Sequence, residues 1–200
     1  MPPLLIATKN PHKVQEYREL LAGLRYTLRS LNDLGIEEDV EEAGDSFEAN
    51  ARLKAERYAE LSGLLTLADD SGLEVDALGG EPGVQSRRWA GERVTDAERN
   101  QSLLERLQDV PEGRRTARFR CAIAIAEPGR PTLVVEGRCA GSIASEPRGS
   151  HGFGYDPVFF VSELGQTLGQ APAAVKNRVS HRARAARAAR AALQERSGAG

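Results

Sequence analysis

The chain begins with a strand followed directly by a helix, and this pair of elements limits the folds that it can adopt. Residues 4–8 begin with the apolar run Leu4-Leu5-Ile6. Asn10 then stands where a helix needs a capping side chain, with Pro11 at the first helical position. Apolar residues repeat at helical spacing to about residue 23. A strand, a tight turn and a helix in this order predict an α/β fold.

Strand and helix patterns alternate along the rest of the chain. They place strands at 26–31, 64–68, 116–126 and 132–139, and helices from Ser46 to about Gly63, from Thr95 onward and from about Ser180. Thr95 and Glu98 have the spacing of a capping box. A Gly-rich loop spans 145–157, and loops of this length within a domain are more often functional than idle.

The composition of the 200 residues is that of one globular domain, with 40% hydrophobic and 28% charged residues. Lys and Arg number 27 against 29 Asp and Glu, which excludes a protein that coats nucleic acid through a global basic field. The longest uninterrupted apolar run, residues 121–126, is far shorter than the roughly 20 residues of a membrane helix. We therefore expect neither a nucleic-acid partner nor a membrane partner.

The first residues and the cysteines indicate the compartment. Residues 1–7 carry no basic segment and run straight into the first strand, so they do not resemble a signal peptide. Cys121 and Cys139 are too few for a disulfide framework, and both stand in strand-like stretches as small hydrophobic residues. We expect a cytoplasmic protein.

The near-zero net charge conceals two segments of opposite sign. Residues 37–48 hold seven acids and no base, whereas residues 176–196 hold seven bases against Glu195. An acidic and a basic patch on one fold suit a polyanion bound through both a metal and cations. Two solvated faces would produce the same pattern, so charge alone leaves both interpretations open.

The corner between the first strand and the first helix is a candidate phosphate site. Thr8-Lys9-Asn10 precedes a helix N-terminus, whose free N–H groups and positive end favour an anion, and Lys13 adds a formal charge in the first turn. An ordinary capped corner is the alternative. The corner is no P-loop, because the chain contains no Gly-x4-Gly-Lys-Ser/Thr sequence.

Asp69 and Asp70 follow the buried strand 64–68, at the carboxyl end where open α/β sheets bind ligands. If the strand continues through them, their side chains point to opposite faces and only one of them faces a given site. We expect Asp70 to be the better exposed, at the end of the strand. A carboxylate helps beside a phosphate only with a divalent cation between them or by taking a proton from water. A turn capped by its own Asp and Ser side chains is the alternative.

Three further groups of residues are candidates for substrate binding, and each could instead have only a structural role. Lys54 lies four residues after Asn50 on one helix face, where a solvated face is the simpler interpretation. The aromatic residues of 153–157 either stack a base or plug the space under their loop. Ser180-His181-Arg182 opens the last helix and says little by itself. The sequence has no zinc-ligand spacing, no Gly-x-Ser-x-Gly and no cysteine with convincing histidine support.

Six blocks in this order resemble the inosine/xanthosine triphosphate pyrophosphatases of the Ham1-like family, from Leu4 to about Leu193. The blocks are Ala7-Thr8-Lys9-Asn10 with Lys13; Ser46-Phe47 with Asn50-Ala51 and Lys54; Ala68-Asp69-Asp70-Ser71-Gly72-Leu73; Gly83 with Ser86, Arg88 and Gly91; Phe153-Gly154-Tyr155-Asp156-Pro157; and Lys176 with Ser180-His181-Arg182. The resemblance implies an elongated mixed central sheet flanked by helices, with two lobes, an active-site cleft between them, and a homodimer. We expect one domain over 1–195 and a flexible tail over 196–200.

The resemblance also implies hydrolysis of ITP, dITP and XTP to the monophosphate and pyrophosphate with Mg²⁺. Glu42 and Asp70 would lie at the metal, and Asp70 would be the general base. The expected substrate-binding residues are Thr8, Lys9, Asn10, Lys13, Lys54, Ser71, Phe153, Gly154, Tyr155, Asp156, Lys176, His181 and Arg182. Selection of a 6-oxo purine needs a hydrogen-bond donor aimed at O6, from Arg182 or from a loop N–H.

Two positions depart from the family pattern. Ala49 stands where the family carries an acid, because the acid has moved to Glu48, about 100° around a helix. Val175 replaces a Glu, with little expected consequence. Two other functions stay open: a related pyrophosphatase with another base preference, and an RNA- or nucleotide-binding module that uses the last helix without turnover.

Overall fold

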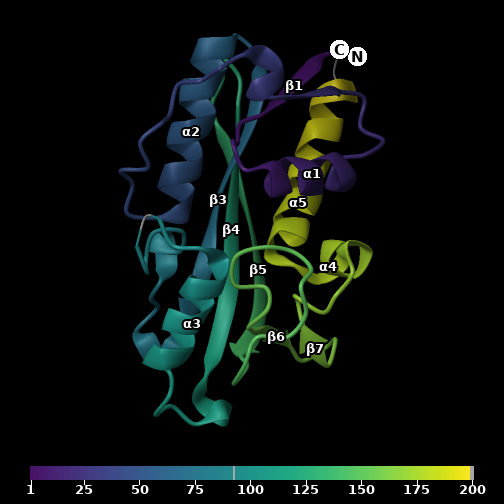
Figure 1. Cartoon of the computed structure of the whole chain (residues 1–200). Coiled ribbons are helices and arrows are strands. Elements are labelled where there is room, and N and C mark those ends of the chain that lie inside the picture. Colours follow the sequence, from purple (N-terminus) through teal and green to yellow (C-terminus); the bar gives the residue numbers. More distant parts are fainter. Residues whose placement is uncertain (92, 199–200) are drawn as a thin grey trace. The chain divides into compact units, whose positions relative to one another are not determined.

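The computed structural model describes residues 1–91 and 93–198 (Figure 1). The chain divides into two compact units. Unit 1 consists of Met1–Asp70, Cys121–Gly137 and the chain from Arg182 onward. Unit 2 consists of Ser71–Arg120 and Arg138–His181. None of the described helices is long and apolar enough to cross a membrane.

The strands of the described chain form one seven-stranded mixed sheet, in the order β2-β1-β3-β4-β5-β6-β7. Their bounds are β1 Pro3–Ile6, β2 Thr27–Ser30, β3 Leu65–Val75, β4 Thr116–Ala126, β5 Leu133–Ile143, β6 Phe159–Val161 and β7 Gln166–Thr167. β1 runs parallel to both β2 and β3, whereas β5, β6 and β7 pair in antiparallel fashion. The expected α/β fold with a mixed sheet is confirmed.

Three helices belong mainly to unit 1: α1 (Pro11–Leu20), α2 (Phe47–Ser62) and α5 (His181–Gly198). Capping starts the first two as predicted, because Asn10 accepts hydrogen bonds from two backbone N–H groups of α1 and Ser46 accepts one from α2. Gly63 ends α2 with φ +68°, the left-handed conformation that favours glycine. α2 lies on one side of the sheet, and α1 and α5 lie on the other (Figure 1).

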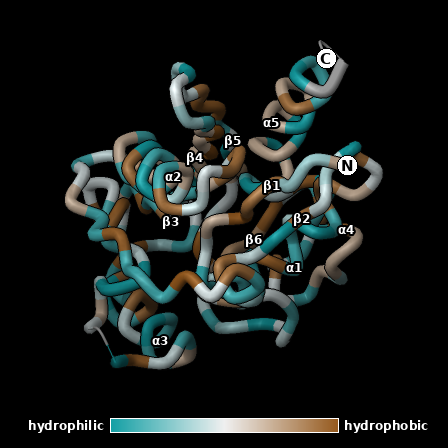
Figure 2. The backbone as a smooth tube through the Cα atoms, turned by 90° about the horizontal axis from the view of Figure 1, so that it is seen from above, coloured by the Kyte–Doolittle hydropathy of each residue, from teal (hydrophilic) through white to brown (hydrophobic). Residues whose placement is uncertain are grey.

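The core of unit 1 joins the sheet to α1 and α5. Its fully buried members include Leu4, Tyr17, Leu67, Ile123 and Leu193. The hydrophobic stretches of the chain run mainly along the strands (Figure 2). α5 stays helical to Gly198, so the predicted tail is helical over its first three residues, and its last two lie outside the described residues.

Unit 2 contains α3 (Asp96–Arg106) and α4 (Ala173–Val179), with a second core that includes Leu73, Leu103 and Phe159. The capping box predicted for α3 is present. α4 is not predicted by the sequence, since it has seven residues and no side-chain cap. Short 3-10 turns lie at Asn32–Leu34, Asp76–Leu78, Gly83–Gln85 and Glu112–Arg114. The loop predicted at 145–157 is confirmed between β5 and β6.

The predicted end of the strand at 64–68 is wrong, and this boundary concerns the candidate site. β3 does not end at Ala68 but continues through both aspartates to Val75. Neither aspartate is exposed at a strand end, since Asp69 is 2% and Asp70 is 6% exposed. The two side chains therefore project from opposite faces of one buried strand.

Candidate functional site

The corner between β1 and α1 is built around Asn10. Its side-chain oxygen accepts hydrogen bonds from His12 N at 2.9 Å and from Lys13 N at 3.4 Å. Its own N–H donates to Thr8 Oγ1 at 3.2 Å. Lys9 differs from its neighbours, because its exposed ammonium pairs with Asp39 at 2.7 Å. The corner therefore presents Thr8, Asn10 and Lys13 together, while Lys9 turns toward the acidic segment.

On one face of β3, Asp69 lies in a buried cluster of charges. Its Oδ2 is 2.9 Å from Lys13 Nζ and 3.3 Å from both Nε and Nη2 of Arg182. Arg182 Nη1 donates in turn to Glu16 at 2.7 Å. Burial alone would raise the pKa of Asp69, but the charges of Lys13 and Arg182 outweigh it and hold that pKa well below its usual range. Asp69 is thus a fixed anion.

On the other face of β3, Asp70 meets residues of α2 and of the acidic segment. Asn50 Nδ2 donates to Asp70 Oδ2 at 3.0 Å, and Lys54 Nζ lies 3.7 Å from Asp70 Oδ1. The same ammonium is 2.5 Å from Glu42 Oε1. Burial raises the pKa of Asp70, the charge of Lys54 lowers it and that of Glu42 raises it, with a net increase. The pKa of Asp70 therefore shifts in the direction opposite to that of Asp69.

The Asp70 face also has the donor chemistry of a hard divalent cation. Glu42 and Asp70 both lie near the ammonium of Lys54, whose Nζ is 2.5 Å from Glu42 Oε1 and 3.7 Å from Asp70 Oδ1. Mg²⁺ prefers carboxylate oxygens and commonly binds through one or two of them together with substrate phosphates and water. No group of three or more His, Cys, Asp or Glu side chains suited to a metal occurs within 1–91 and 93–198. The two carboxylates fit a metal that shares its coordination with a phosphorylated substrate.

In unit 2, the loop before β6 forms a second constellation around Asp156. Asp156 Oδ2 accepts from Phe153 N at 2.9 Å and from Lys176 Nζ at 2.5 Å. The Lys176 ammonium also lies 4.7 Å from the centre of the half-buried Phe153 ring. Both partners of the ion pair are buried, so their charges are taken out of water together. Phe153 is thereby fixed as an aromatic surface beside a cation.

Two of the predicted nucleoside-binding residues lie in the unit 2 core. The Tyr155 hydroxyl donates to Ser86 O at 2.9 Å, and burial raises the pKa of Tyr155 far above its usual value. This geometry favours the plug interpretation for Tyr155. His181 is buried and stacks on Phe119, with ring centres 4.5 Å apart. Ser71 is half-buried within β3.

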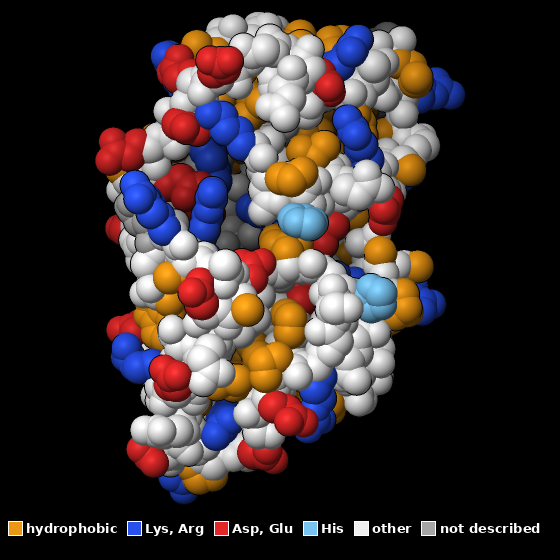
Figure 3. Space-filling view, viewed as in Figure 1, with side chains coloured by type: hydrophobic (Ala, Val, Ile, Leu, Met, Phe, Trp, Pro, Cys, Tyr) orange, Lys and Arg blue, Asp and Glu red, His pale blue; other side chains and the backbone are white. Residues whose placement is uncertain are grey.

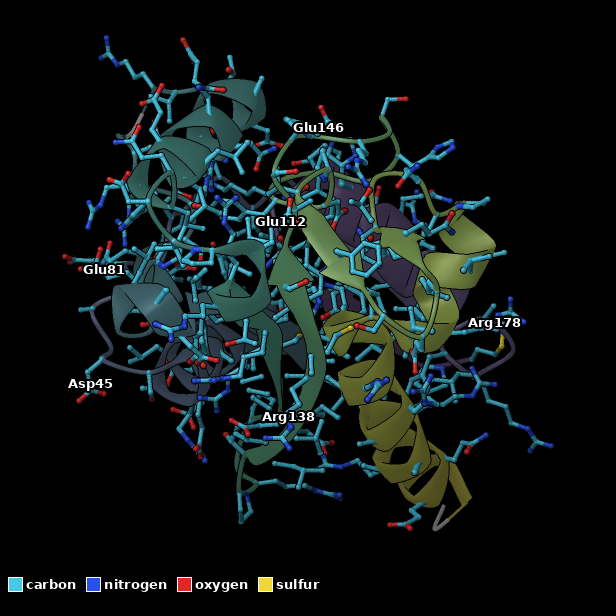
Figure 4. The ribbon with its side chains drawn as sticks, turned by 90° about the horizontal axis from the view of Figure 1, so that it is seen from below. Asp45, Glu81, Glu112, Arg138, Glu146 and Arg178 are labelled. Carbon is cyan, nitrogen blue, oxygen red and sulfur yellow. The ribbon has the colours of Figure 1, made fainter. Side chains whose placement is uncertain are left out.

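The charged segments contain both functional candidates and solvated residues. Glu42 and Lys176 are ion-paired within the two constellations, whereas Asp45 and Arg178 are exposed and point outward (Figure 4). Basic side chains gather beside α2 with acidic ones among them (Figure 3). The solvated-face interpretation therefore applies to some residues of each segment, while others are held in ion pairs.

Asp69, Asn50 and Glu16 belong to these clusters but were not among the predicted site residues. Asn50 bonds to Asp70, and its position four residues before Lys54 on α2 was the available sequence signal. Glu16 bonds to Arg182 from α1, across 166 positions of the sequence. No local pattern marks such a partner.

Comparison with known proteins identifies the family. The model of the Ham1 family matches residues 4–192. The chain belongs to the Ham1 family. It is 47% identical over 195 residues to a dITP/XTP pyrophosphatase from Bacillus licheniformis, covering 98% of this chain and 100% of that protein. It is 51% identical over 185 residues to one from Geobacillus kaustophilus, covering 92% and 91%.

Solved structures of the Ham1 family have the same fold. A HAM1 protein from Coxiella burnetii matches with a TM-score of 0.89 at 40% identity, covering 98% of this chain and 100% of that one. The Ham1 protein of Staphylococcus aureus matches with a TM-score of 0.87 at 38% identity, covering 97% and 99%. The likeness extends over both units of this Ham1 family chain.

Proposed function

We propose that this Ham1 family chain is an enzyme that hydrolyses dITP, XTP and ITP to the nucleoside monophosphate and pyrophosphate. The observation that carries the proposal is the Asp70 cluster, in which burial and Glu42 raise the pKa of one aspartate beside Lys54. The names of the relatives, dITP/XTP pyrophosphatases over nearly the whole chain, supply the substrate class.

The triphosphate would bind to unit 1. The α1 N-terminus offers a positive helix end, and Thr8 and Asn10 stand beside it. Lys13 and Lys54 supply ammonium groups whose side chains are 14% and 12% exposed, so they meet a phosphate with little competing water. Lys9 would add an exposed charge once it leaves Asp39.

Glu42 and Asp70 would hold the metal, which we propose to be Mg²⁺. When bound, it supplies positive charge to the phosphate oxygens and to the departing pyrophosphate. The Lys54 ammonium lies against the same carboxylates and would neutralise further charge as the phosphorus is attacked.

Asp70 would orient the attacking water and accept its proton. The water oxygen bonds to the α-phosphorus, and the bond from that phosphorus to the bridging oxygen breaks in line with it. The electron pair leaves with pyrophosphate. Asn50 holds Oδ2 of Asp70 through a hydrogen bond, so one carboxylate oxygen is anchored while the other faces Lys54.

The purine would stack on Phe153, with Asp156, Lys176 and Gly154 around it. Tyr155 and His181 would support the site from the core rather than contact the base. Arg182 is committed to Asp69 and Glu16, which favours a loop N–H as the donor to O6. Ser71 follows the general base directly in β3 and would contact substrate.

The remaining proposals concern the setting of the enzyme. One domain made of the two units would act on a small nucleotide rather than on nucleic acid or a membrane. Resemblance to the family supports a homodimer. Cys121 and Cys139 are buried and form no disulfide with each other, which suits the reducing cytoplasm where nucleotide pools lie.

A substrate panel with separate assays for pyrophosphate and orthophosphate tests this function. We expect Mg²⁺-dependent release of pyrophosphate from dITP and XTP, much faster than from ATP or GTP and abolished by EDTA. Orthophosphate as the product would exclude attack at the α-phosphorus. Faster cleavage of a modified pyrimidine triphosphate would favour the related pyrophosphatase, and salt-sensitive RNA binding without turnover would favour the binding module.

A further inference from the structure

We propose that Asp96 and Asn100 of α3 are positioning residues that hold the Phe153 loop, residues 153–156, in the conformation that receives the purine. The inference rests on the proposed function and deepens it, because it assigns substrate affinity to two side chains that need not touch the substrate. Both hydrogen-bond to the backbone of one loop residue, Gly154.

The two side chains form hydrogen bonds with the N–H and the C=O of Gly154. Asp96 Oδ2 accepts a hydrogen bond from Gly154 N at 2.6 Å, and Asn100 Nδ2 donates to Gly154 O at 3.0 Å. Asp96 and Asn100 stand four residues apart, so they project from one face of α3. Because both the N–H and the C=O of Gly154 are hydrogen-bonded to α3, a change in the backbone conformation of Gly154 would break one of the two bonds.

The conformation held there is one that few residues adopt. Gly154 has φ +63°, in the left-handed region where a side chain is strained. On its other side the loop is tied by Asp156, which accepts from Phe153 N. Gly152 gives Asp156 the room to do so, because a Cβ at position 152 would lie 2.0 Å from Asp156 Oδ2. The backbone N–H groups on either side of the Phe153 side chain, its own and that of Gly154, are therefore each held by a carboxylate.

The local structure of α3 does not explain these contacts. Thr95 and Glu98 already cap the helix in a reciprocal capping box, so Asp96 is not needed as the cap. Asp96 Oδ1 pairs with Arg99, which leaves Oδ2 for Gly154. Asn100 is 3% exposed, and its Oδ1 has no hydrogen-bond partner although it is buried. Burying the Asn100 amide while its oxygen accepts no hydrogen bond costs free energy. The hydrogen bond from Nδ2 to Gly154 O is the contact that explains why this amide is buried.

Fixing the loop before substrate binds would lower the entropy lost on binding. The consequence is a lower KM, with little effect on a chemical step carried out by unit 1 residues. A merely structural role in α3 would instead lower stability and leave KM unchanged.

The test compares Asp96→Ala with Asp96→Asn, whose amide oxygen can still accept from Gly154 N, and with Gln101→Ala as the matched control. Gln101 is exposed on α3 and donates to Glu105. Hydrogen exchange of the Gly154 amide is measured by NMR in the protein without nucleotide, and kcat and KM are measured with dITP. Amides in the middle of β4 report global stability.

For Asp96→Ala we expect Gly154 exchange to accelerate about tenfold and KM to rise about tenfold, with kcat within about twofold, because a charge-assisted hydrogen bond is worth this order. Asp96→Asn should recover most of both effects, and Gln101→Ala should show neither. Unchanged Gly154 exchange, unchanged KM, or equal acceleration at β4 would overturn the proposal. If the unmodified enzyme fails to hydrolyse dITP, the proposed function fails, while the exchange measurement still decides whether Asp96 holds the loop.

Discussion

The two faces of β3 place the same residue type in opposite electrostatic situations. Asp69 has two cations close to one of its oxygens, Lys13 and Arg182. Asp70 shares the one ammonium of Lys54 with a second carboxylate, Glu42. Both aspartates are buried, but the pKa of Asp69 lies below its usual range and that of Asp70 lies above it.

Charge balance, rather than burial, accounts for the opposite pKa shifts of the two aspartates. Burial disfavours the anion at both positions. Two cations overcome that penalty for Asp69, whereas the lysine shared with Glu42 does not do so for Asp70. Substitution of either aspartate removes one side of this contrast.

Asp70→Asn should lower kcat by on the order of 10³-fold, because a positioned general base contributes factors of this size. KM should change little, since Lys13 and Lys54 remain in place. Steady-state kinetics with dITP at saturating Mg²⁺ measure the effect, with Asp45→Asn as the exposed control. A kcat within about tenfold of the unmodified enzyme would show that Asp70 is not the base.

Asp69→Asn should lower the free energy of unfolding by about 3 kcal/mol at pH 7, because Lys13 and Arg182 then lose their buried counter-ion. The native pKa of Asp69 lies below its unfolded value, so its ionised form stabilises the fold at pH above about 4. The difference between variant and parent should therefore shrink as the pH falls through and below that value. Denaturant titrations in EDTA at pH 7 and at acidic pH measure it.

Equal stability of Asp69→Asn and its parent at pH 7 would refute a structural role for the Asp69 cluster. Asp45→Asn is again the control, since an exposed substitution is expected to stay within about 0.5 kcal/mol.

Asp70→Asn should change stability least and in the opposite direction, with a gain below about 1 kcal/mol at pH 7 in EDTA. The native pKa of Asp70 lies above its unfolded value, so ionisation at neutral pH destabilises the fold and a neutral amide avoids that penalty. The gain should disappear as the pH falls below about 4, where both proteins are neutral at position 70. A clear loss of stability at pH 7 would place Asp70 with Asp69 as a structural carboxylate.

The elements that the sequence predicts well are those with local causes. Asn10, Ser46 and Thr95 each satisfy backbone N–H groups within three residues, so a capping pattern is sufficient to find their helices. Resemblance to the family pointed to Lys13, Lys54 and Glu42. The structure pairs Lys13 with Asp69, and the Lys54 ammonium lies near both Asp70 and Glu42.

What the sequence missed depends on partners that are distant along the chain. Asp-Asp-Ser-Gly has the composition of a turn, and β3 continues through it because Lys13 and Arg182 neutralise Asp69 from 56 positions before it and 113 after it. The same reason hid Glu16 and the Gly154 contacts of α3, since nothing near those residues in the sequence specifies what they touch.

The chain passes between its two units after Asp70, Arg120, Gly137 and His181. Three of these crossings fall inside β3, β4 and β5, and the fourth falls in the first turn of α5, so none lies in a loop. Neither unit is one continuous stretch of the gene. A single duplication, fusion or deletion therefore cannot copy or remove one unit and leave the other intact. New specificities in such a chain have to arise by substitution and by changes in loops, rather than by exchange of whole modules.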